Sequence, residues 1–201
     1  RLPIYDPKAN LIVDVGGGTT EVAVISLGGV VASRSLRVAG DKLNEDIVQH
    51  VKDEFRLLIG ERMAEEIKIS IGSVWPEDED LEMDISGRDA VTGLPKEIKI
   101  SSLEIRKALM RSTRLIINAI KDTIEDTPPE LISDLTKKAV YLAGGGSLLR
   151  GLDVLLSHET KLPVKVIDDP LTAVVRGCGI ILEDIDKLSD VLVSTEKEDF
   201  L

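Results

Sequence analysis

Two runs of three consecutive glycines restrict the fold of this sequence more than any other feature. The first lies in "LIVDVGGGTTEVAVISLGGVV" (residues 11–31), between two apolar stretches rich in β-branched residues. The second lies in "LAGGGSLLRGL" (residues 142–152), after a strand-like run and before a helix-like one. A plain turn needs one or two glycines, and extra glycine weakens a fold unless another group approaches the backbone. Each run therefore predicts a turn at the end of a strand that some other group approaches closely.

The first glycine run has the composition of an anion-binding turn, because consecutive glycines let backbone amides point toward one phosphate without obstruction. These amides would come from three glycines: Gly16, Gly17 and Gly18. Thr19 and Thr20 would offer hydroxyls to a terminal phosphate or an attacking water, and Asp14 would hold a hydrated Mg²⁺. The run lacks the lysine of a P-loop, and the strand-like segment after it does not fit a dinucleotide-binding fingerprint. A plain hairpin turn remains the alternative.

The second glycine run passes from a strand into a helix. The amides of such a turn, together with the helix dipole, form a site for an anion or a sugar. The residues concerned are Gly144, Gly145, Gly146 and Ser147. The alternative is an ordinary strand-to-helix turn in which Ser147 is the N-cap. Because both runs follow strands, they predict one shared cleft at the carboxyl ends of a sheet.

Hydrophobic periodicity predicts the elements that follow the first turn. Three strands joined by glycine turns form a meander, at residues 11–15, 21–27 and 30–38. Asp41 is predicted to cap a helix whose apolar residues recur at helical spacing: Ile47, Val51, Phe55 and Leu58. A second helix and two short strands are expected within 61–70, 81–89 and 96–100. The block is therefore predicted to be a small inserted α+β subdomain.

A capping box, Ser101 with Glu104, is predicted to open a long helix after this block. Further helices and strands alternate as far as the end of the chain. Antiparallel strands first and strand–helix units later predict an α/β fold, with a mixed five-stranded sheet and helices on both faces. The predicted divisions are a core at 1–40 and 101–190, an inserted subdomain at 41–100 and a polar tail at 191–201.

Composition excludes several classes of protein. A hydrophobic content of 43% with 30% charged residues indicates a soluble globular chain, and a formal charge of −11 argues against a general nucleic-acid binder. Cys178, the only cysteine, lies in an apolar stretch that predicts a buried side chain, and Trp75 is expected to be a local packing anchor. His50 and His158 lack metal-ligand spacing, and no apolar run reaches the roughly 18 residues of a membrane span. The start at Arg1 is typical of a piece of a longer protein.

Taken together, the motifs resemble the MreB family of bacterial actin homologues. The segments that carry the resemblance are "IVDVGGGTTEVAVISLGGVV", "GDKLNEDI", "IGERMAEEIK", "LAGGGSLLRGL", "DTPPELISDL" and "DDPLTAVVRGCG". They stand in the order and spacing of the C-terminal half of that family and span about residues 2–188. The resemblance implies an actin-like ATPase fold, which is ribonuclease-H-like, with ATP or ADP and Mg²⁺ as cofactors.

The resemblance also implies a role for each glycine turn. Residues 14–20 fall on the family's second phosphate loop, where Asp14 faces Mg²⁺ through water and Thr19 and Thr20 support catalysis at the γ-phosphate. The turn at 144–147 falls on the adenosine loop. Glu65 and Lys68 match positions that hold the ribose or the adenine. Since these two residues share a helix face, the alternative for them is a surface salt bridge.

In the family that the sequence resembles, ATP stabilises head-to-tail filaments that determine rod cell shape by organising cell-wall synthesis. The implied partners are further copies of the protein, the cell-wall elongation machinery and a membrane adaptor such as RodZ, at the inner face of the cell membrane. The family's first phosphate loop, catalytic acid and membrane-binding segment belong to an N-terminal half without a counterpart in these residues. We therefore expect little or no ATP hydrolysis by this chain alone. The alternatives are half of a sugar or acid kinase, half of a chaperone ATPase, and a structural module whose glycine turns only shape the fold.

Overall fold

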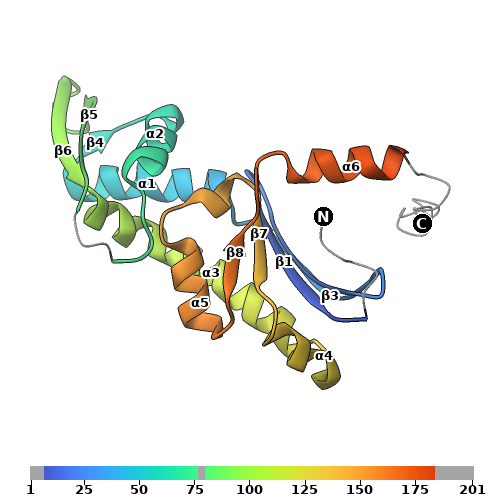
Figure 1. Ribbon diagram of the computed structural model, residues 1–201. Coiled ribbons are helices and arrows are strands. Elements are labelled where there is room, and N and C mark those ends of the chain that lie inside the picture. Colours follow the sequence, from blue (N-terminus) through green and yellow to red (C-terminus); the bar gives the residue numbers. More distant parts are fainter. Residues whose placement is uncertain (1–6, 77–79, 184–201) are drawn as a thin grey trace, which may run out of the picture.

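The computed structural model describes residues 7–76 and 80–183 (Figure 1). The polar tail predicted at 191–201 and part of the acidic segment "PEDED" lie outside the described residues. Two sheets organise the described part, one of five strands and one of three. A contiguous core of buried apolar side chains extends through both of them.

The larger sheet is mixed, with the strand order β3-β2-β1-β7-β8. Its strands are β1 (Asn10–Val15), β2 (Thr20–Ser26), β3 (Gly29–Leu36), β7 (Val140–Ala143) and β8 (Val164–Val166). The first three pair antiparallel as two consecutive hairpins, whereas β7 pairs parallel with both β1 and β8. The predicted meander and the predicted mixed five-stranded sheet are therefore confirmed.

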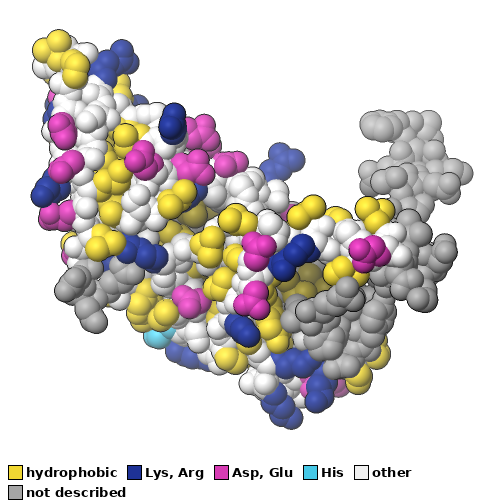
Figure 2. Space-filling view, turned by 45° about the horizontal axis from the view of Figure 1, so that its top comes forward, with side chains coloured by type: hydrophobic (Ala, Val, Ile, Leu, Met, Phe, Trp, Pro, Cys, Tyr) yellow, Lys and Arg dark blue, Asp and Glu magenta, His cyan; other side chains and the backbone are white. Residues whose placement is uncertain are grey.

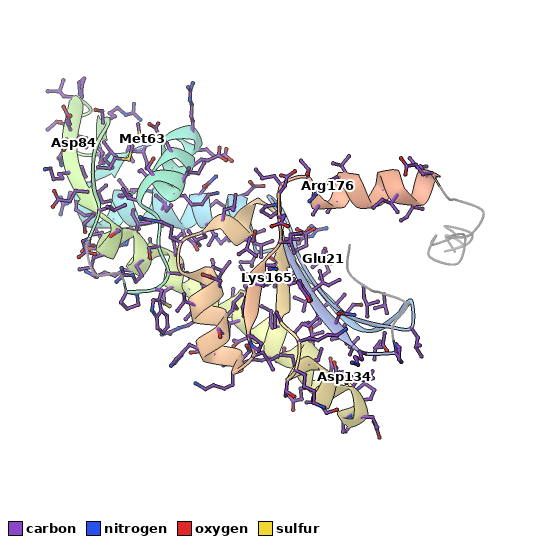
Figure 3. The ribbon with its side chains drawn as sticks, viewed as in Figure 1. Glu21, Met63, Asp84, Asp134, Lys165 and Arg176 are labelled. Carbon is purple, nitrogen blue, oxygen red and sulfur yellow. The ribbon has the colours of Figure 1, made fainter. Side chains whose placement is uncertain are left out.

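The two faces of this sheet are covered unequally. Val13 pairs with Val22 on one side and Leu142 on the other, and all three side chains are buried on the same face. The helices α3 (Ser102–Glu125) and α5 (Leu152–Thr160) contact each other and pack against β2, β3 and β8. On the opposite face Ala23 is only half-buried and Lys165 is exposed (Figure 3). A short helix, α4 (Pro129–Leu135), packs near β1.

The last described helix, α6 (Ala173–Glu183), extends away from the sheet, and none of its residues is buried (Figure 1). Arg176 anchors its first turn, since Nη2 donates to the carbonyls of Asp168 (2.7 Å) and Asp169 (2.9 Å). Apolar side chains are exposed along this helix (Figure 2), and Cys178 is exposed as well. The prediction that Cys178 is buried is wrong, because no described element covers α6. Among the described residues, no helix combines the length and apolar character needed to cross a membrane.

A second group of elements lies between the meander and α3. In chain order these are α1 (Gly40–Phe55), β4 (Leu57–Leu58), α2 (Glu61–Ile71), β5 (Glu82–Asp89) and β6 (Pro95–Ser101). The three strands form an antiparallel sheet in the order β4-β5-β6. Both α1 and α2 contact α3, so the long helix joins this group to the larger sheet.

Three local predictions about helix ends have different outcomes. Asp41 is not the N-cap of α1, which begins at Gly40 after Ala39 and has no side-chain cap. Leu58 is not helical, because Arg56 adopts the left-handed conformation (φ 54°) and Leu58 then pairs with Arg88 in a strand. The predicted cap at Ser101 is confirmed, since its hydroxyl accepts a hydrogen bond from the Glu104 amide at 3.4 Å.

Trp75 packs against the core as expected, with its Cβ near Gly151.

Candidate functional site

The two glycine turns lie side by side. They follow β1 and β7, which are adjacent parallel strands with Asp14 in register with Ala143. A Cβ placed on Gly144 would be 2.3 Å from the carboxylate Oδ1 of Asp14 and 2.3 Å from the carbonyl oxygen of Val15. The structure therefore confirms the prediction that both turns lie together at the carboxyl ends of the strands.

The first turn is a hairpin turn with an exposed tip. The Gly16 amide donates to the Thr19 carbonyl at 2.9 Å, which closes the turn between β1 and β2. Thr20 is fully buried, and its hydroxyl donates to the Val38 carbonyl at 2.7 Å. Gly17, Gly18 and Thr19 are exposed. The fold therefore uses the Gly16 amide and the Thr20 hydroxyl, and leaves the Thr19 hydroxyl at the tip.

The N-terminus of α1 is hydrogen-bonded to the backbone of the first turn. The Gly40 amide donates to the Gly16 carbonyl (3.1 Å), and the Asp41 amide donates to the Gly17 carbonyl (2.9 Å). In a trans peptide unit, a carbonyl and the amide that follows it point in opposite directions. The amides of Gly17 and Gly18 consequently point away from α1, on the exposed side of the turn. This is the orientation that an anion approaching from solvent requires.

The second turn is built differently. Gly144 has φ +78° and precedes a short 3₁₀ helix, η1 (Gly145–Leu148). The Ser147 hydroxyl is buried and donates to the Gly144 carbonyl at 2.6 Å. The alternative in which Ser147 is the N-cap of the following helix is wrong, because α5 begins at Leu152 after Gly151. The Ser147 hydroxyl is therefore bonded within the turn, and Gly145 and Gly146 of η1 are partly exposed.

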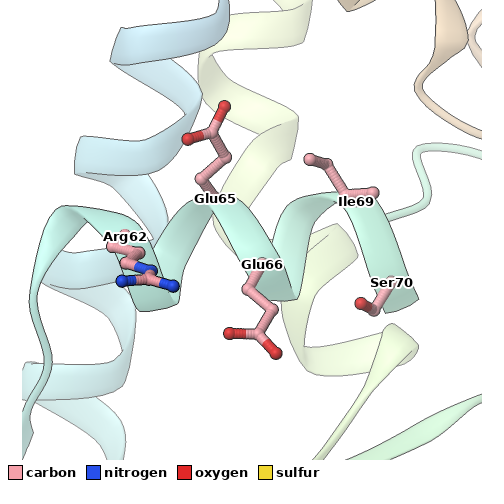
Figure 4. Close-up of a pocket in the computed structure, with 5 residues that line it drawn as sticks. All are labelled: Arg62, Glu65, Glu66, Ile69 and Ser70. Carbon is pink, nitrogen blue, oxygen red and sulfur yellow. The ribbon is translucent and has the colours of Figure 1, made fainter.

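The two candidate residues of α2 have separate surroundings. Glu65 is exposed and lines a shallow hollow of about 290 Å³ on one face of α2 (Figure 4). Lys68 is half-buried, and its Nζ donates to the Gly40 carbonyl at 3.0 Å. Burial lowers the pKa of Lys68, while the carboxylates of Glu65 and Asp41 act in the opposite direction. A simple surface salt bridge is therefore not what Lys68 makes, because its donor is directed at the backbone beside the first turn.

The carboxyl group of Asp14, at the end of β1, has a raised pKa. Partial burial raises the pKa of its carboxyl group, and the carboxylate of Glu21, its cross-strand partner, raises it further. A carboxylate in this position favours a nearby cation. Within the described part of the chain, no group of three or more His, Cys, Asp or Glu side chains is placed to hold a metal ion. Mg²⁺ would therefore fit here only with water and phosphate oxygens completing its coordination, which is how Mg²⁺ is commonly bound.

Known proteins resemble this chain in sequence and in fold. The sequence model of the MreB/Mbl protein family matches residues 1–190. The chain belongs to the MreB/Mbl family. It is 46% identical to the cell shape-determining protein Mbl of Bacillus subtilis over 187 residues, which is 93% of this chain and 56% of that protein. It is 47% identical to the cell shape-determining protein MreB of Escherichia coli over 195 residues, which is 97% of this chain and 56% of that protein.

Solved structures confirm the actin-like fold of this MreB/Mbl family member. MreB5 of Spiroplasma citri bound to ADP superimposes with a TM-score of 0.90 at 40% identity, covering 94% of this chain and 57% of that one. A MamK double helical filament superimposes with a TM-score of 0.72 at 23% identity, covering 87% of this chain and 54% of that one. The chain thus spans about half the length of the relatives it matches.

Sequence reasoning missed one part of the site, the backbone of Gly40 and Asp41. Their amides hold the first turn, although the pattern predicted Asp41 only as a helix cap. A Cβ on Gly40 would be 3.2 Å from the Gly16 carbonyl oxygen and 3.5 Å from the Gly17 Cα. A glycine at the start of a predicted helix is the signal for such a close backbone contact.

Proposed function

We propose that this chain is the nucleotide-binding C-terminal half of an MreB-type actin-like ATPase. The observation that carries the proposal is the exposed tip of the first turn. Neither Gly17 nor Gly18 has a positive φ, and a Cβ on either would come no closer than 3.6 Å to the surrounding atoms. The fold does not require glycine at these two positions, so the bare backbone is available to an approaching ligand. MreB5, which is 40% identical, has been crystallised with ADP and with AMPPNP.

The residues at the tip would bind the phosphates of the nucleotide. The amides of Gly17 and Gly18 and the hydroxyl of Thr19 would donate to the β- and γ-phosphates, and Asp14 would orient Mg²⁺ through water. Mg²⁺, when bound, neutralises phosphate charge. Thr20 would contribute by fixing the end of the turn through its bond to Val38 rather than by touching the ligand.

The second turn and α2 would bind the nucleoside. Gly145 and Gly146, in η1, offer a backbone surface to adenosine, while Gly144 and Ser147 shape this turn. Glu65, exposed on α2, would accept hydrogen bonds from the ribose or the base. Hydrolysis needs a water held in line with the γ-phosphate and a closed cleft. Because these residues supply only one side of such a cleft, we expect weak or undetectable ATP hydrolysis by this chain alone.

We infer that the complete protein assembles head to tail into filaments that organise cell-wall synthesis and so set rod cell shape. Membership of a cell shape-determining family supports this function over a sugar or acid kinase. The proposed partners are further copies of the protein, the cell-wall elongation machinery and a membrane adaptor such as RodZ. The proposed location is the inner face of the cell membrane, reached through a preceding half.

Nucleotide-dependent sedimentation tests this function. This chain, fused behind the N-terminal half of a close relative, should pellet with ATP and Mg²⁺ and stay in the supernatant without nucleotide. The 201-residue chain by itself should stay in the supernatant under both conditions. Pelleting that ignores nucleotide, or an ATPase rate of the chain alone equal to that of the fusion, would contradict the proposal.

A further inference from the structure

The helix α6 carries an apolar stripe that the described part of the chain leaves in solvent (Figure 2). The stripe residues recur at a spacing of three and four and so share one side of the helix: Val174, Val175, Cys178, Ile181 and Leu182. Val174, Val175 and Leu182 are 60%, 67% and 71% exposed. The two charged residues of α6, Arg176 and Glu183, lie on the other side of the helix. A contiguous exposed apolar surface of this kind indicates an interaction site.

The segment before α6 keeps this stripe away from the sheet of its own chain. The Gly144 amide donates to the Pro170 carbonyl at 3.0 Å, and Arg176 donates to the carbonyls of Asp168 and Asp169. Asp169 also has a left-handed backbone, with φ 50°. These bonds fix the direction in which α6 leaves the sheet (Figure 1), so the helix cannot fold back onto that sheet without breaking them.

The larger sheet has a partly exposed apolar strip on the face opposite α3 and α5. Ala23, Ile12 and Tyr141 are consecutive partners across β2, β1 and β7, and each is only half-buried. Ile25, two residues after Ala23 on β2, is also half-buried and lies on the same face, because side chains alternate along a strand. We name these four residues the open strip. The six residues of β1 span about 20 Å and the 11 residues of α6 about 16 Å, so the helix fits along the strip.

We propose that this chain forms a dimer in which α6 of each copy packs its apolar stripe on the open strip of the other copy. A second copy is the occupant that the two surfaces favour, because one chain supplies both the exposed helix and the partly exposed strip. A reciprocal exchange about a two-fold axis removes both surfaces from water in both copies. Pairing of α6 with α6 would cover the two stripes and leave both open strips in solvent. The contact is apolar and does not involve the glycine turns, so it goes beyond the proposed function.

Sedimentation equilibrium of the chain without nucleotide gives the first test. The wild-type chain should show twice the mass of one chain, and Val175→Glu should weaken the dimer at least about tenfold, because a carboxylate would be buried without a partner. Val91→Glu makes the same change at a valine that is 69% exposed, in the turn between β5 and β6. It is the matched control and should leave the dimer unchanged. A wild-type chain that stays monomeric at every concentration up to saturation would overturn the proposal.

A change on the open strip tests which surface α6 contacts. In the monomer of Ala23→Lys, the long side chain can extend its ammonium group into solvent, so the circular dichroism spectrum should match the wild type. In the dimer the same group would lie under α6, and we expect the dimer to weaken at least about tenfold. If Ala23→Lys folds and dimerises like the wild type, α6 does not pack on the strip and the exchange is wrong.

The thiol of Cys178, the only cysteine, reports directly on the stripe. Its rate of reaction with a thiol reagent should fall in proportion to the dimer fraction as the chain concentration rises, because a covered thiol does not react. In Val175→Glu the reaction should stay fast at all concentrations. Protection of Cys178 that appears only when the N-terminal half of a relative is fused before this chain would assign α6 to that half and overturn the proposal.

Discussion

The two glycine turns have almost the same sequence but depend on glycine for different reasons. In the second turn, Gly144 has φ +78°, and a Cβ there would be 2.3 Å from atoms of Asp14 and Val15. In the first turn, Gly17 and Gly18 have neither a positive φ nor a neighbour closer than 3.6 Å to a Cβ. The second turn thus needs glycine to pack against β1, whereas positions 17 and 18 of the first turn need it only if something outside the described chain approaches.

The two kinds of glycine position carry different information about a ligand. A glycine that the fold itself requires carries no information about a ligand, because any other residue would disrupt the structure. A glycine that the fold does not require is informative, since it costs backbone entropy without a structural return. The first turn is therefore the stronger indication of a phosphate site, although the second is the one that leads into helical structure.

The largest effect should come from Gly144→Ala. A Cβ at this position combines a left-handed backbone with a collision against the β1 backbone, so we expect a loss of roughly 3–5 kcal/mol in the free energy of unfolding. Urea denaturation followed by circular dichroism measures it. A loss below about 1 kcal/mol would show that the second turn does not need its glycine.

A smaller loss of stability should follow Gly146→Ala. Its Cβ would lie 2.3 Å from Cγ1 of Val15, 2.9 Å from the Cβ of that residue and 3.0 Å from its carbonyl oxygen, so we expect a loss of about 1–3 kcal/mol in the free energy of unfolding. The double variant with Val15→Ala should lose less stability than the sum of the losses in the two single variants, because removing Cγ1 relieves the shortest of these contacts. If the two stability losses were simply additive in a double-mutant cycle, the strain in Gly146→Ala would not come from its contact with the Val15 side chain.

Gly17→Ala should weaken ligand binding while leaving the stability of the chain nearly unchanged. The new Cβ would be in ordinary contact with the Asp41 carboxylate, at 3.6 Å, so stability should stay within about 0.5 kcal/mol of the wild type. Affinity for ATP should nevertheless fall about tenfold to a hundredfold, because the added methyl group would hold the phosphate away from the amide, which alanine keeps, and so weaken a hydrogen bond to a charged group. Gly29→Ala, in the neighbouring hairpin, is the control and should change neither quantity. Isothermal titration calorimetry that finds wild-type affinity for Gly17→Ala would favour a purely structural turn.

The smallest effect concerns Asp14, which lies between the two turns. Its pKa in the folded chain is raised, chiefly by burial and then by Glu21, so the folded state holds this proton more tightly than the unfolded chain does. Stability is therefore lost as the pH rises from the ordinary value of 3.8 through the folded pKa, and Asp14→Asn avoids that loss. At neutral pH the variant should be more stable, by less than about 1 kcal/mol since the group is half-exposed, and this advantage should vanish below the ordinary pKa. If the stability gained by Asp14→Asn did not change with pH, the ionisation of Asp14 would not be its cause.

Much of the fold could be predicted from local patterns. The apolar β-branched run at 11–15 and the alternation at 21–27 predict the first two strands, and Ser101 with Glu104 predicts the start of α3. Leu58 was assigned to a helix because its spacing fits one, but the left-handed Arg56 ends α1 and β5 pairs with the next residues. That outcome depends on a strand that follows more than twenty residues later.

The site could be predicted as a pair of turns but not in the roles of individual side chains. The hydroxyls of Thr20 and Ser147 are each bonded to a carbonyl, and for Thr20 that carbonyl belongs to Val38, eighteen residues away. Lys68, which is predicted to lie at the nucleoside, also donates to the Gly40 carbonyl, and its spacing on the helix does not predict that contact. Short motifs specify which backbone can bind an anion, whereas the partner of a side chain is decided by tertiary packing.

An NMR titration of this chain with ATP and Mg²⁺, observed at the backbone amides, tests phosphate binding by the first turn directly. The chemical-shift changes should concentrate at Gly17, Gly18 and Thr19, with smaller changes at Gly145 and Gly146, and Gly17→Ala should remove those of the first turn. Changes confined to the second turn, or to surfaces away from both turns such as the hollow beside Trp75, would contradict it.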